Sequence, residues 1–220
     1  MNRLALFDCD GTMVDSQANI CLAMERAFDE CGLVPPPRNA TRHIVGLSLT
    51  EAMRQLLPDG EPDLHARLAD SYRLAFQSLR ANGLVNEPLY DGLAGLLTRL
   101  DETGWRLGVA TGKSDRGLKN CLDFHGLSGL FVTLQTADRH PSKPHPSMVR
   151  QAMADADAQV GRTIVIGDTV YDMEMATNAG VRAIGVSWGY HAPDTLLAAG
   201  AVAVAETMDE LASFMEHCID

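Results

Sequence analysis

The chain has 220 residues, a formal net charge of −11 at pH 7, and 46% hydrophobic residues. This length fits one large domain, or a core with a modest insert, and the composition can supply a sizeable core. The acidic balance argues against binding to nucleic acid or to an anionic membrane surface, because both require a basic footprint. No run approaches the ~20 apolar residues of a membrane span, and the apolar start is too short for a signal peptide.

The cysteines are odd in number and scattered, with no CxxC or CxxH pair that would indicate a zinc site. They stand at Cys9, Cys21, Cys31, Cys121 and Cys218. This usage predicts reduced thiols in a cytoplasmic protein. The sequence shows no heptad repeat and leaves the oligomeric state open.

The first part of the chain begins with an apolar strand, expected at residues 3–7, and then becomes helical. Proline-rich breaks separate the helical runs, as expected from the fixed φ of proline. The helices are expected at 16–31, 50–57 and 63–82. Residues 15–84 therefore read as an all-helical segment.

From residue 85 the pattern alternates between strand and helix. Strands are expected at 105–110, 131–135, 163–167, 182–186 and 201–204. Helices are expected at 91–103, 115–125, 147–157, 170–179, 194–199 and 207–217. Such alternation is typical of an α/β fold with a doubly wound, Rossmann-like parallel sheet. We therefore predict a core of residues 1–14 and 85–220, into which residues 15–84 are inserted as a helical cap domain.

Two carboxylates follow the first strand, at Asp8 and Asp10. Residues two apart in an extended segment point the same way, so both should converge at the carboxyl end of the strand, and Cys9 should face away. Like charges held together must be offset by a cation or a shared proton. The alternative is an Asp-rich turn, in which Asp and Gly only punctuate the chain.

Two later strands also end in polar groups, where open α/β sheets place their ligands. Thr111 and Gly112 stand at a strand-to-helix turn, where a hydroxyl and backbone N–H groups can hold phosphate oxygens. Asp168 and Asp172 are spaced to face one point on a helix. Alternatively, Asp168 is a helix N-cap and Asp172 offsets the helix dipole.

The gathered carboxylates predict a hard cation, and Mg²⁺ prefers one or two carboxylates with phosphate oxygens and water. Lys143 follows on a proline-rich loop that can hold its ammonium in place. The alternative is an ordinary solvated lysine.

These four motifs, in this order, resemble those of the haloacid dehalogenase-like hydrolase superfamily. They are Asp8-Cys9-Asp10-Gly11-Thr12, the strand-ending Thr111, Lys143-Pro144, and Gly167-Asp168-Thr169-Val170-Tyr171-Asp172. The match extends over nearly the whole chain. The insert is similar to the helical cap of the subgroup that includes phosphoglycolate phosphatase and β-phosphoglucomutase.

The resemblance implies a role for each matching residue. Asp8 would be the nucleophile that forms an aspartyl-phosphate, and Asp10 the general acid and then the general base. Thr111 would bind phosphoryl oxygens, and Lys143 would neutralise developing charge. The side chains of Asp8 and Asp168 and the carbonyl of Asp10 would hold Mg²⁺, with Asp172 as a further ligand or a hydrogen-bonding neighbour.

Details of the sequence narrow the reaction that the resemblance implies. Asp10 favours phosphoryl transfer, because the dehalogenases of this superfamily lack an acid there. Leu49 occupies the position at which β-phosphoglucomutases carry an arginine, and the absence of lysine between residues 14 and 112 excludes the Schiff-base route of phosphonatases. A Mg²⁺-dependent phosphatase acting on a small phosphorylated metabolite, similar to phosphoglycolate phosphatase, is the leading expectation. The alternatives are a sugar-phosphate mutase, a pyrophosphatase, or a non-catalytic metabolite-binding regulator.

Substrate choice is expected to depend on the cap. Arg42, His43 and Ser48 are predicted to meet the leaving group when the cap closes, the alternative being a solvated cap surface. Lys113, Ser114 and Arg116 are candidates to line the entrance of the site. Alternatively, they only form the first turn of an ordinary helix.

Overall fold

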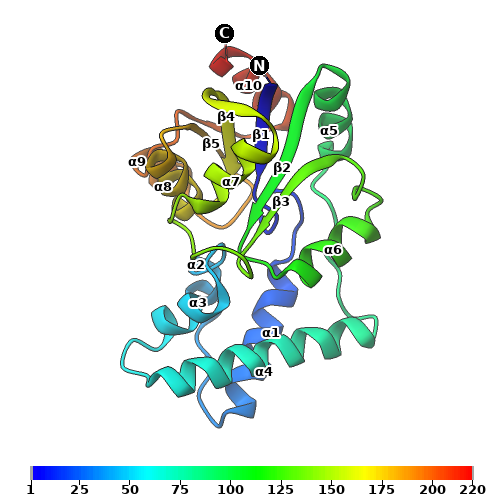
Figure 1. The fold of residues 1–220 in the computed structure, drawn as a ribbon. Coiled ribbons are helices and arrows are strands. Elements are labelled where there is room, and N and C mark those ends of the chain that lie inside the picture. The colour runs from blue at the N-terminus through cyan, green and yellow to red at the C-terminus, as the bar shows by residue number, and fades with distance from the viewer. Residues whose placement is uncertain (1, 220) are drawn as a thin grey trace.

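The computed structural model describes residues 2–219. Figure 1 shows two layers, an α/β core and a group of helices beyond one edge of its sheet. The sheet has six strands, all parallel, in the order β3-β2-β1-β4-β5-β6. Their bounds are β1 (Asn2–Phe7), β2 (Trp105–Thr111), β3 (Phe131–Thr136), β4 (Ala158–Gly167), β5 (Arg182–Val186) and β6 (Ala203–Ala205). The predicted doubly wound α/β fold is therefore confirmed.

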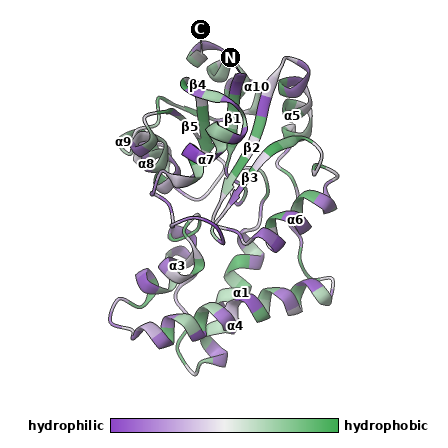
Figure 2. Cartoon of the chain, in the orientation of Figure 1, coloured by the Kyte–Doolittle hydropathy of each residue, from purple (hydrophilic) through white to green (hydrophobic). Residues whose placement is uncertain are grey.

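Helices cover both faces of the sheet. They are α5 (Leu93–Glu102), α6 (Asp115–Phe124), α7 (Ser147–Asp155), α8 (Val170–Ala179), α9 (Pro193–Ala198) and α10 (Met208–Ile219). One buried cluster joins α5, α6 and α10 to one face, and a second joins α7, α8 and α9 to the other. Along β1, Ala5 and Phe7 enter the first cluster, whereas Leu4 and Leu6 enter the second. This period-2 pattern buries β1 on both faces, as expected for a parallel sheet, and Figure 2 colours the strands as largely hydrophobic.

The position of β1 brings three strand ends together. Phe7 pairs with Val109 of β2 on one side and with Ile166 of β4 on the other. The chain order of the strands reverses between β1 and β4, which is where doubly wound sheets open a crevice for ligands. The residues that follow these three strands therefore meet at one edge.

The second layer, hereafter the cap, is all-helical. It contains α1 (Gln17–Glu30), α2 (Arg38–His43), α3 (Leu49–Leu56) and α4 (Pro62–Ala81). Its small apolar centre includes Met24, Phe28, Met53 and Leu68. The cap lies beyond the carboxyl edge of the sheet (Figure 1). The exact boundaries between core and cap, at 14/15 and 84/85, stay a prediction.

Three details differ from the expected elements. A short helix, α2, follows Pro37; its polar sequence gave no apolar period to predict it. Strand β4 begins at Ala158 rather than at residue 163. The sequence did not reveal this earlier start, because the first residues of the strand are mostly exposed and lack the apolar pattern of a buried strand. Strand β6 covers Ala203–Ala205 rather than 201–204. Within residues 2–219, no helix is both long and apolar enough to cross a membrane.

Candidate active site

Three buried carboxylates lie together at the carboxyl edge of the sheet. Asp8 follows β1, Asp168 follows β4, and Asp172 lies in the first turn of α8. Each offers an oxygen within 4.8 Å of the others. The predicted convergence of Asp8, Asp168 and Asp172 is thus observed.

Lys143 lies inside this cluster, on the loop between β3 and α7. Its Nζ donates to Oδ1 of Asp8 at 2.8 Å and to Oδ1 of Asp172 at 2.6 Å, and its side chain is fully buried. Burial by itself lowers the pKa of Lys143, but the charges of Asp172 and Asp8 outweigh it and raise the pKa above its ordinary value. The lysine therefore stays an ammonium, and the alternative of a solvated lysine is wrong.

One cation does not balance three carboxylates. Burial, which outweighs the attraction of Lys143, raises the pKa of Asp8 to about 7. Burial and then the charges of Asp8 and Asp172 raise the pKa of Asp168 well above its ordinary value. Oδ2 of Asp8 is buried without a hydrogen-bond partner. An orphaned oxygen among hard oxygen donors is what a Mg²⁺ ion requires, so the residues present fit that cation.

The other two carboxylates are held rigidly. Oδ1 of Asp168 accepts from Oγ1 of Thr12 at 2.7 Å, and Oδ2 accepts from the N–H of Tyr190 at 2.9 Å. Oδ2 of Asp172 accepts from the N–H of Thr169 at 3.1 Å and from its hydroxyl at 2.6 Å. Thr169, not Asp168, is the N-cap of α8, so the N-cap alternative for Asp168 is wrong. Asp172 does lie in the first turn, and it also pairs with Lys143.

Gly11 allows the loop after β1 to pass close to the carboxylates. Its φ is +85°, and a Cβ there would lie 2.2 Å from Oδ2 of Asp168. Only glycine adopts such a φ at low cost and leaves this space open. The glycine of the Asp-x-Asp-Gly sequence is thus required by the packing of the site.

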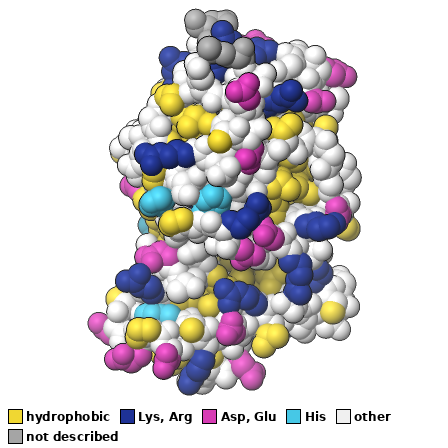
Figure 3. Space-filling view, viewed as in Figure 1, with side chains coloured by type: hydrophobic (Ala, Val, Ile, Leu, Met, Phe, Trp, Pro, Cys, Tyr) yellow, Lys and Arg dark blue, Asp and Glu magenta, His cyan; other side chains and the backbone are white. Residues whose placement is uncertain are grey.

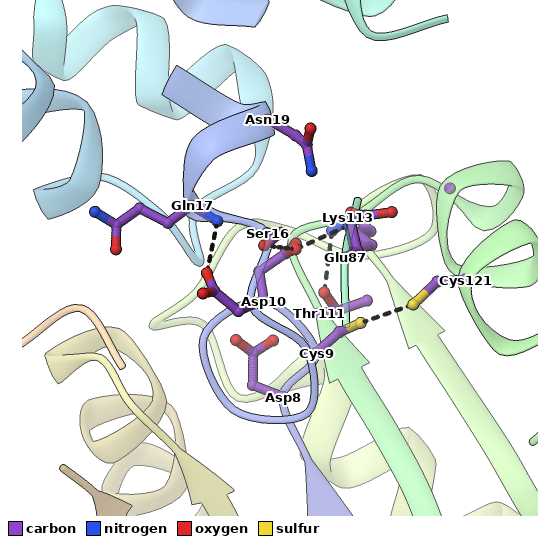
Figure 4. A network of polar contacts seen from close by, with 12 residues as sticks. Asp8, Cys9, Asp10, Ser16, Gln17, Asn19, Glu87, Thr111, Lys113 and Cys121 are labelled. Atoms are coloured by element: carbon purple, nitrogen blue, oxygen red, sulfur yellow. Dashed lines mark hydrogen bonds and ion pairs between the residues drawn. The ribbon is translucent and has the colours of Figure 1, made fainter. Parts of the chain in front are cut away.

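Asp10, which the sequence predicts to converge with Asp8, does not belong to this group of three carboxylates. Its Oδ1 accepts a hydrogen bond from Oγ of Ser16 and pairs with Nζ of Lys113 at 2.8 Å (Figure 4). The magnesium contact predicted for Asp10 concerns its backbone carbonyl and stays a prediction. Cys9, between the two aspartates, is fully buried in the core, with its Sγ 4.0 Å from that of Cys121, which confirms that it faces away from the site.

Thr111 is the last residue of β2, and Gly112 follows it. Oγ1 of Thr111 accepts from the N–H of Lys113 at 3.2 Å, which leaves the hydroxyl proton free for an anion. A Cβ at Gly112 would lie 2.5 Å from the carbonyl oxygen of Leu47 in the cap. The backbone of the cap therefore lies directly over this turn.

The turn between α2 and α3 docks the cap on the core. The N–H of Ser48 donates to Oγ of Ser142 at 2.8 Å, and Oη of Tyr171 donates to the carbonyl of His43 at 3.2 Å. Nδ1 of His191 accepts from the N–H of Val170 at 3.1 Å, so Nε2 carries the proton and donates to the same His43 carbonyl at 3.1 Å. The cap is therefore closed over the carboxylates.

A cavity of about 590 Å³ lies between the cap and the core. The cap contributes mainly apolar and aromatic residues of α1, the α2–α3 turn and α4, together with Arg73, Gln77 and Arg80 of α4, and the core contributes mainly polar residues. Figure 3 shows Lys and Arg side chains beside a yellow recess between the two layers. Asp10, Ser48 and Gly112 line the cavity.

Arg42 and His43 do not line this cavity. The ring of His43 stacks instead on that of His191, with centroids 4.6 Å apart. With the cap in this position, Arg42 and His43 lie outside the cavity, and their contact with the leaving group stays a prediction.

Four residues with clear positions at the site had no role predicted from the sequence: Thr12, Ser16, Glu87 and Tyr190. Thr12 and Ser16 belong to the same stretch of sequence as Asp8 and Asp10, and this closeness in sequence could have predicted that they lie at the site. Glu87 and Tyr190 lie in segments without a recognisable pattern.

Comparisons with known proteins agree with this geometry. A family model described as haloacid dehalogenase-like hydrolase matches residues 5–186. "Probable phosphatase IndB" of Dickeya dadantii is 36% identical over 96% of this chain and 92% of its own length. The phosphoglycolate phosphatase of Pseudomonas putida is 28% identical over 99% of this chain and 80% of its own. A crystal structure described as a predicted phosphatase from Clostridium acetobutylicum is 26% identical, with a TM-score of 0.88 over 99% of both chains. The chain therefore belongs to the haloacid dehalogenase-like hydrolases and to their phosphoglycolate phosphatase-like subgroup.

Proposed function

We propose that this hydrolase is a Mg²⁺-dependent phosphatase that cleaves a small phosphomonoester through an aspartyl-phosphate on Asp8. The observation that carries the proposal is the environment of Asp8. Its carboxylate is buried, one oxygen is held by Lys143, and the other has no hydrogen-bond partner. Asp10 lies on the side of the cavity that would receive the leaving group.

The residues divide the reaction between them. The Asp8 carboxylate forms the new bond to phosphorus while the bond from phosphorus to the leaving oxygen breaks, and Asp10 gives that oxygen a proton. Asp10, now a carboxylate, takes a proton from the water that attacks the aspartyl-phosphate, and the Asp8 carboxylate is released. Lys143 orients Asp8, and the hydroxyl of Thr111 and nearby N–H groups bind the phosphoryl oxygens.

Asp8, Asp168 and the carbonyl of Asp10 would hold Mg²⁺, with Asp172 beside them. When bound, the cation supplies charge stabilisation at the phosphoryl oxygens. The closed cap excludes water from this buried edge and must open for substrate to enter. The substrate is expected to be a small phosphorylated metabolite of the cytoplasm, with phosphoglycolate as the first candidate.

The proposal is tested by a hydrolysis screen with Mg²⁺ or with a chelator, using Asp8→Asn as the blank. The substrates are phosphoglycolate, sugar phosphates, nucleotides, pyrophosphate and 4-nitrophenyl phosphate. We expect phosphate release that requires Mg²⁺ and that is absent from the Asp8→Asn variant. Preference for pyrophosphate would identify a pyrophosphatase, and isomerisation of a sugar phosphate without phosphate release would identify a mutase. No turnover of any substrate with Mg²⁺ present would favour the non-catalytic regulator.

A further inference from the structure

Lys113 lies between two carboxylates at the boundary of core and cap (Figure 4). Its Nζ is 2.8 Å from Oδ1 of Asp10 and 2.9 Å from Oε1 of Glu87. Burial by itself lowers the pKa of Lys113, but the charges of Asp10 and Glu87 outweigh it and raise the pKa well above its ordinary value. Lys113 is therefore a fixed ammonium whose donors are already directed at protein groups.

The contacts of Asp10 are concentrated on one of its oxygens. Oδ1 accepts a hydrogen bond from the Ser16 hydroxyl and forms the ion pair with the Lys113 ammonium. A proton on Oδ1 would displace the hydrogen bond from Ser16 and weaken the ion pair with Lys113, so Oδ2 is the oxygen that can carry one. Among the residues that the structure describes, none makes a hydrogen bond to Oδ2 of Asp10. A protonated Asp10 held in this way carries its proton on Oδ2.

We propose that Lys113 is a positioning residue for the general acid: together with Ser16 it fixes Oδ1 of Asp10, so that Oδ2 is the oxygen that passes the proton to the leaving group. This inference rests on the phosphatase function proposed above. Lys113 acts through Asp10 and need not touch the substrate.

Glu87 and the cap hold Lys113 in place from the other side. Oε2 of Glu87 accepts from Nη2 of Arg80 at 2.8 Å, and Arg80 belongs to the cap helix α4. Burial raises the pKa of Glu87, but Lys113 and Arg80 outweigh it and leave the pKa below its usual value. Charges therefore alternate from Arg80 through Glu87 and Lys113 to Asp10.

A direct role for Lys113 in binding an anionic substrate fits the contacts less well. Its two carboxylate partners would have to be given up for the substrate. Arg116 lines the same cavity and, in the part of the chain that the structure describes, makes no ion pair. Arg116 is therefore a cation available to a substrate, whereas Lys113 is paired with Asp10 and Glu87.

The dependence of rate on the leaving group tests this role. An alkyl alcohol needs a proton to depart, whereas 4-nitrophenolate departs without one. General acid catalysis contributes about 10²- to 10⁴-fold. Lys113→Met should therefore lower kcat/KM for an alkyl phosphate by about 10²-fold. The loss of kcat/KM for 4-nitrophenyl phosphate should be several times smaller. The parameter kcat/KM is used because it covers leaving-group departure and not the later hydrolysis of the aspartyl-phosphate. Lys119→Met, which changes an exposed lysine of the following helix α6, is the matched control and should alter neither value.

A double variant separates positioning from a structural role. In an Asp10→Asn background, Lys113→Met should cause little further loss, because its effect passes through Asp10. The inference would be overturned if the loss of kcat/KM in the double variant equalled the product of the two single losses. It would also be overturned if Lys113→Met alone lowered kcat/KM equally for both substrates. If Lys113→Met does not fold, Lys113→Gln keeps N–H donors without the charge and must show the same leaving-group dependence. A wild-type protein inactive on every substrate would instead refute the proposed function itself.

Discussion

The ammonium of Lys143 lies 2.8 Å from Oδ1 of Asp8, although 135 residues separate the two in the chain. The pair exists because β3 lies parallel to β2 and β2 parallel to β1, so that the loop after β3 reaches the edge at which β1 ends. It also makes Lys143 the internal counterion of an otherwise negative cluster.

Replacement of Lys143 by methionine should therefore reduce both activity and stability. The variant keeps the volume of the side chain but leaves buried carboxylates without their cation. Breaking a buried pair in this way costs about 3–5 kcal/mol of unfolding free energy, and turnover should fall by at least about 10²-fold. Urea unfolding and hydrolysis of 4-nitrophenyl phosphate measure the two effects. Lys119→Met, at an exposed pair, should leave both nearly unchanged; equal losses in the two variants would contradict the assignment.

The free energy of unfolding of the metal-free protein should fall as the pH rises from acidic values toward neutrality. The pKa of Asp8 is about 7 in the folded chain against an ordinary value of 3.8, and that of Asp168 is also raised. Between about pH 4 and pH 7 the native state therefore binds more protons than the unfolded state. The unfolding free energy consequently decreases as the pH rises through this range. Mg²⁺ should consequently raise Tm more at about pH 8 than at about pH 5. Calorimetry with Mg²⁺ or chelator measures this difference, and equal shifts at both pH values would count against a metal site at these carboxylates.

Gly11→Ala should lower the free energy of unfolding far more than the same substitution at another glycine with a similar φ. Gly11 has φ +85° and Gly32 has φ +72°, but a Cβ meets Asp168 at 2.2 Å only at Gly11 and meets nothing within 4 Å at Gly32. Gly32→Ala thus isolates the backbone cost, about 1 kcal/mol. We expect Gly11→Ala to lose more than this in urea unfolding and to lose Mg²⁺ stabilisation. Similar losses in both variants would show that crowding against Asp168 does not matter.

Ser142→Ala should loosen the closed cap. The variant leaves the N–H of Ser48 without its hydrogen bond to Oγ of Ser142, which costs about 1 kcal/mol and shifts the opening equilibrium about fivefold. Hydrogen exchange of the cap turn should accelerate accordingly. Ser128→Ala removes an exposed hydroxyl bonded to Asp123 and should leave exchange at the cap turn unchanged. Unaltered exchange in Ser142→Ala would mean that other contacts determine closure.

The sheet and the carboxylate cluster follow from the sequence because apolar strands end directly in polar residues. Parallel pairing then forces Asp8, Thr111 and Asp168 to the same edge. The environment of Asp10 could not be found this way. Lys113 has the local sequence of a helix start, and only tertiary contacts with Asp10 and Glu87 distinguish it. The orientation of His43 was equally inaccessible, because docking against His191 sets it.

The central place of β1 has a consequence for the newly made chain. Strand β1 is completed first, yet its neighbour β4 ends only at Gly167. The helices of the cap depend on contacts closer in sequence and can associate earlier during synthesis. Until the chain has passed α8, Asp8 has neither Asp168 nor Asp172 beside it. During synthesis the chain therefore carries Asp8, the proposed nucleophile, long before the two carboxylates that complete its cluster have been made.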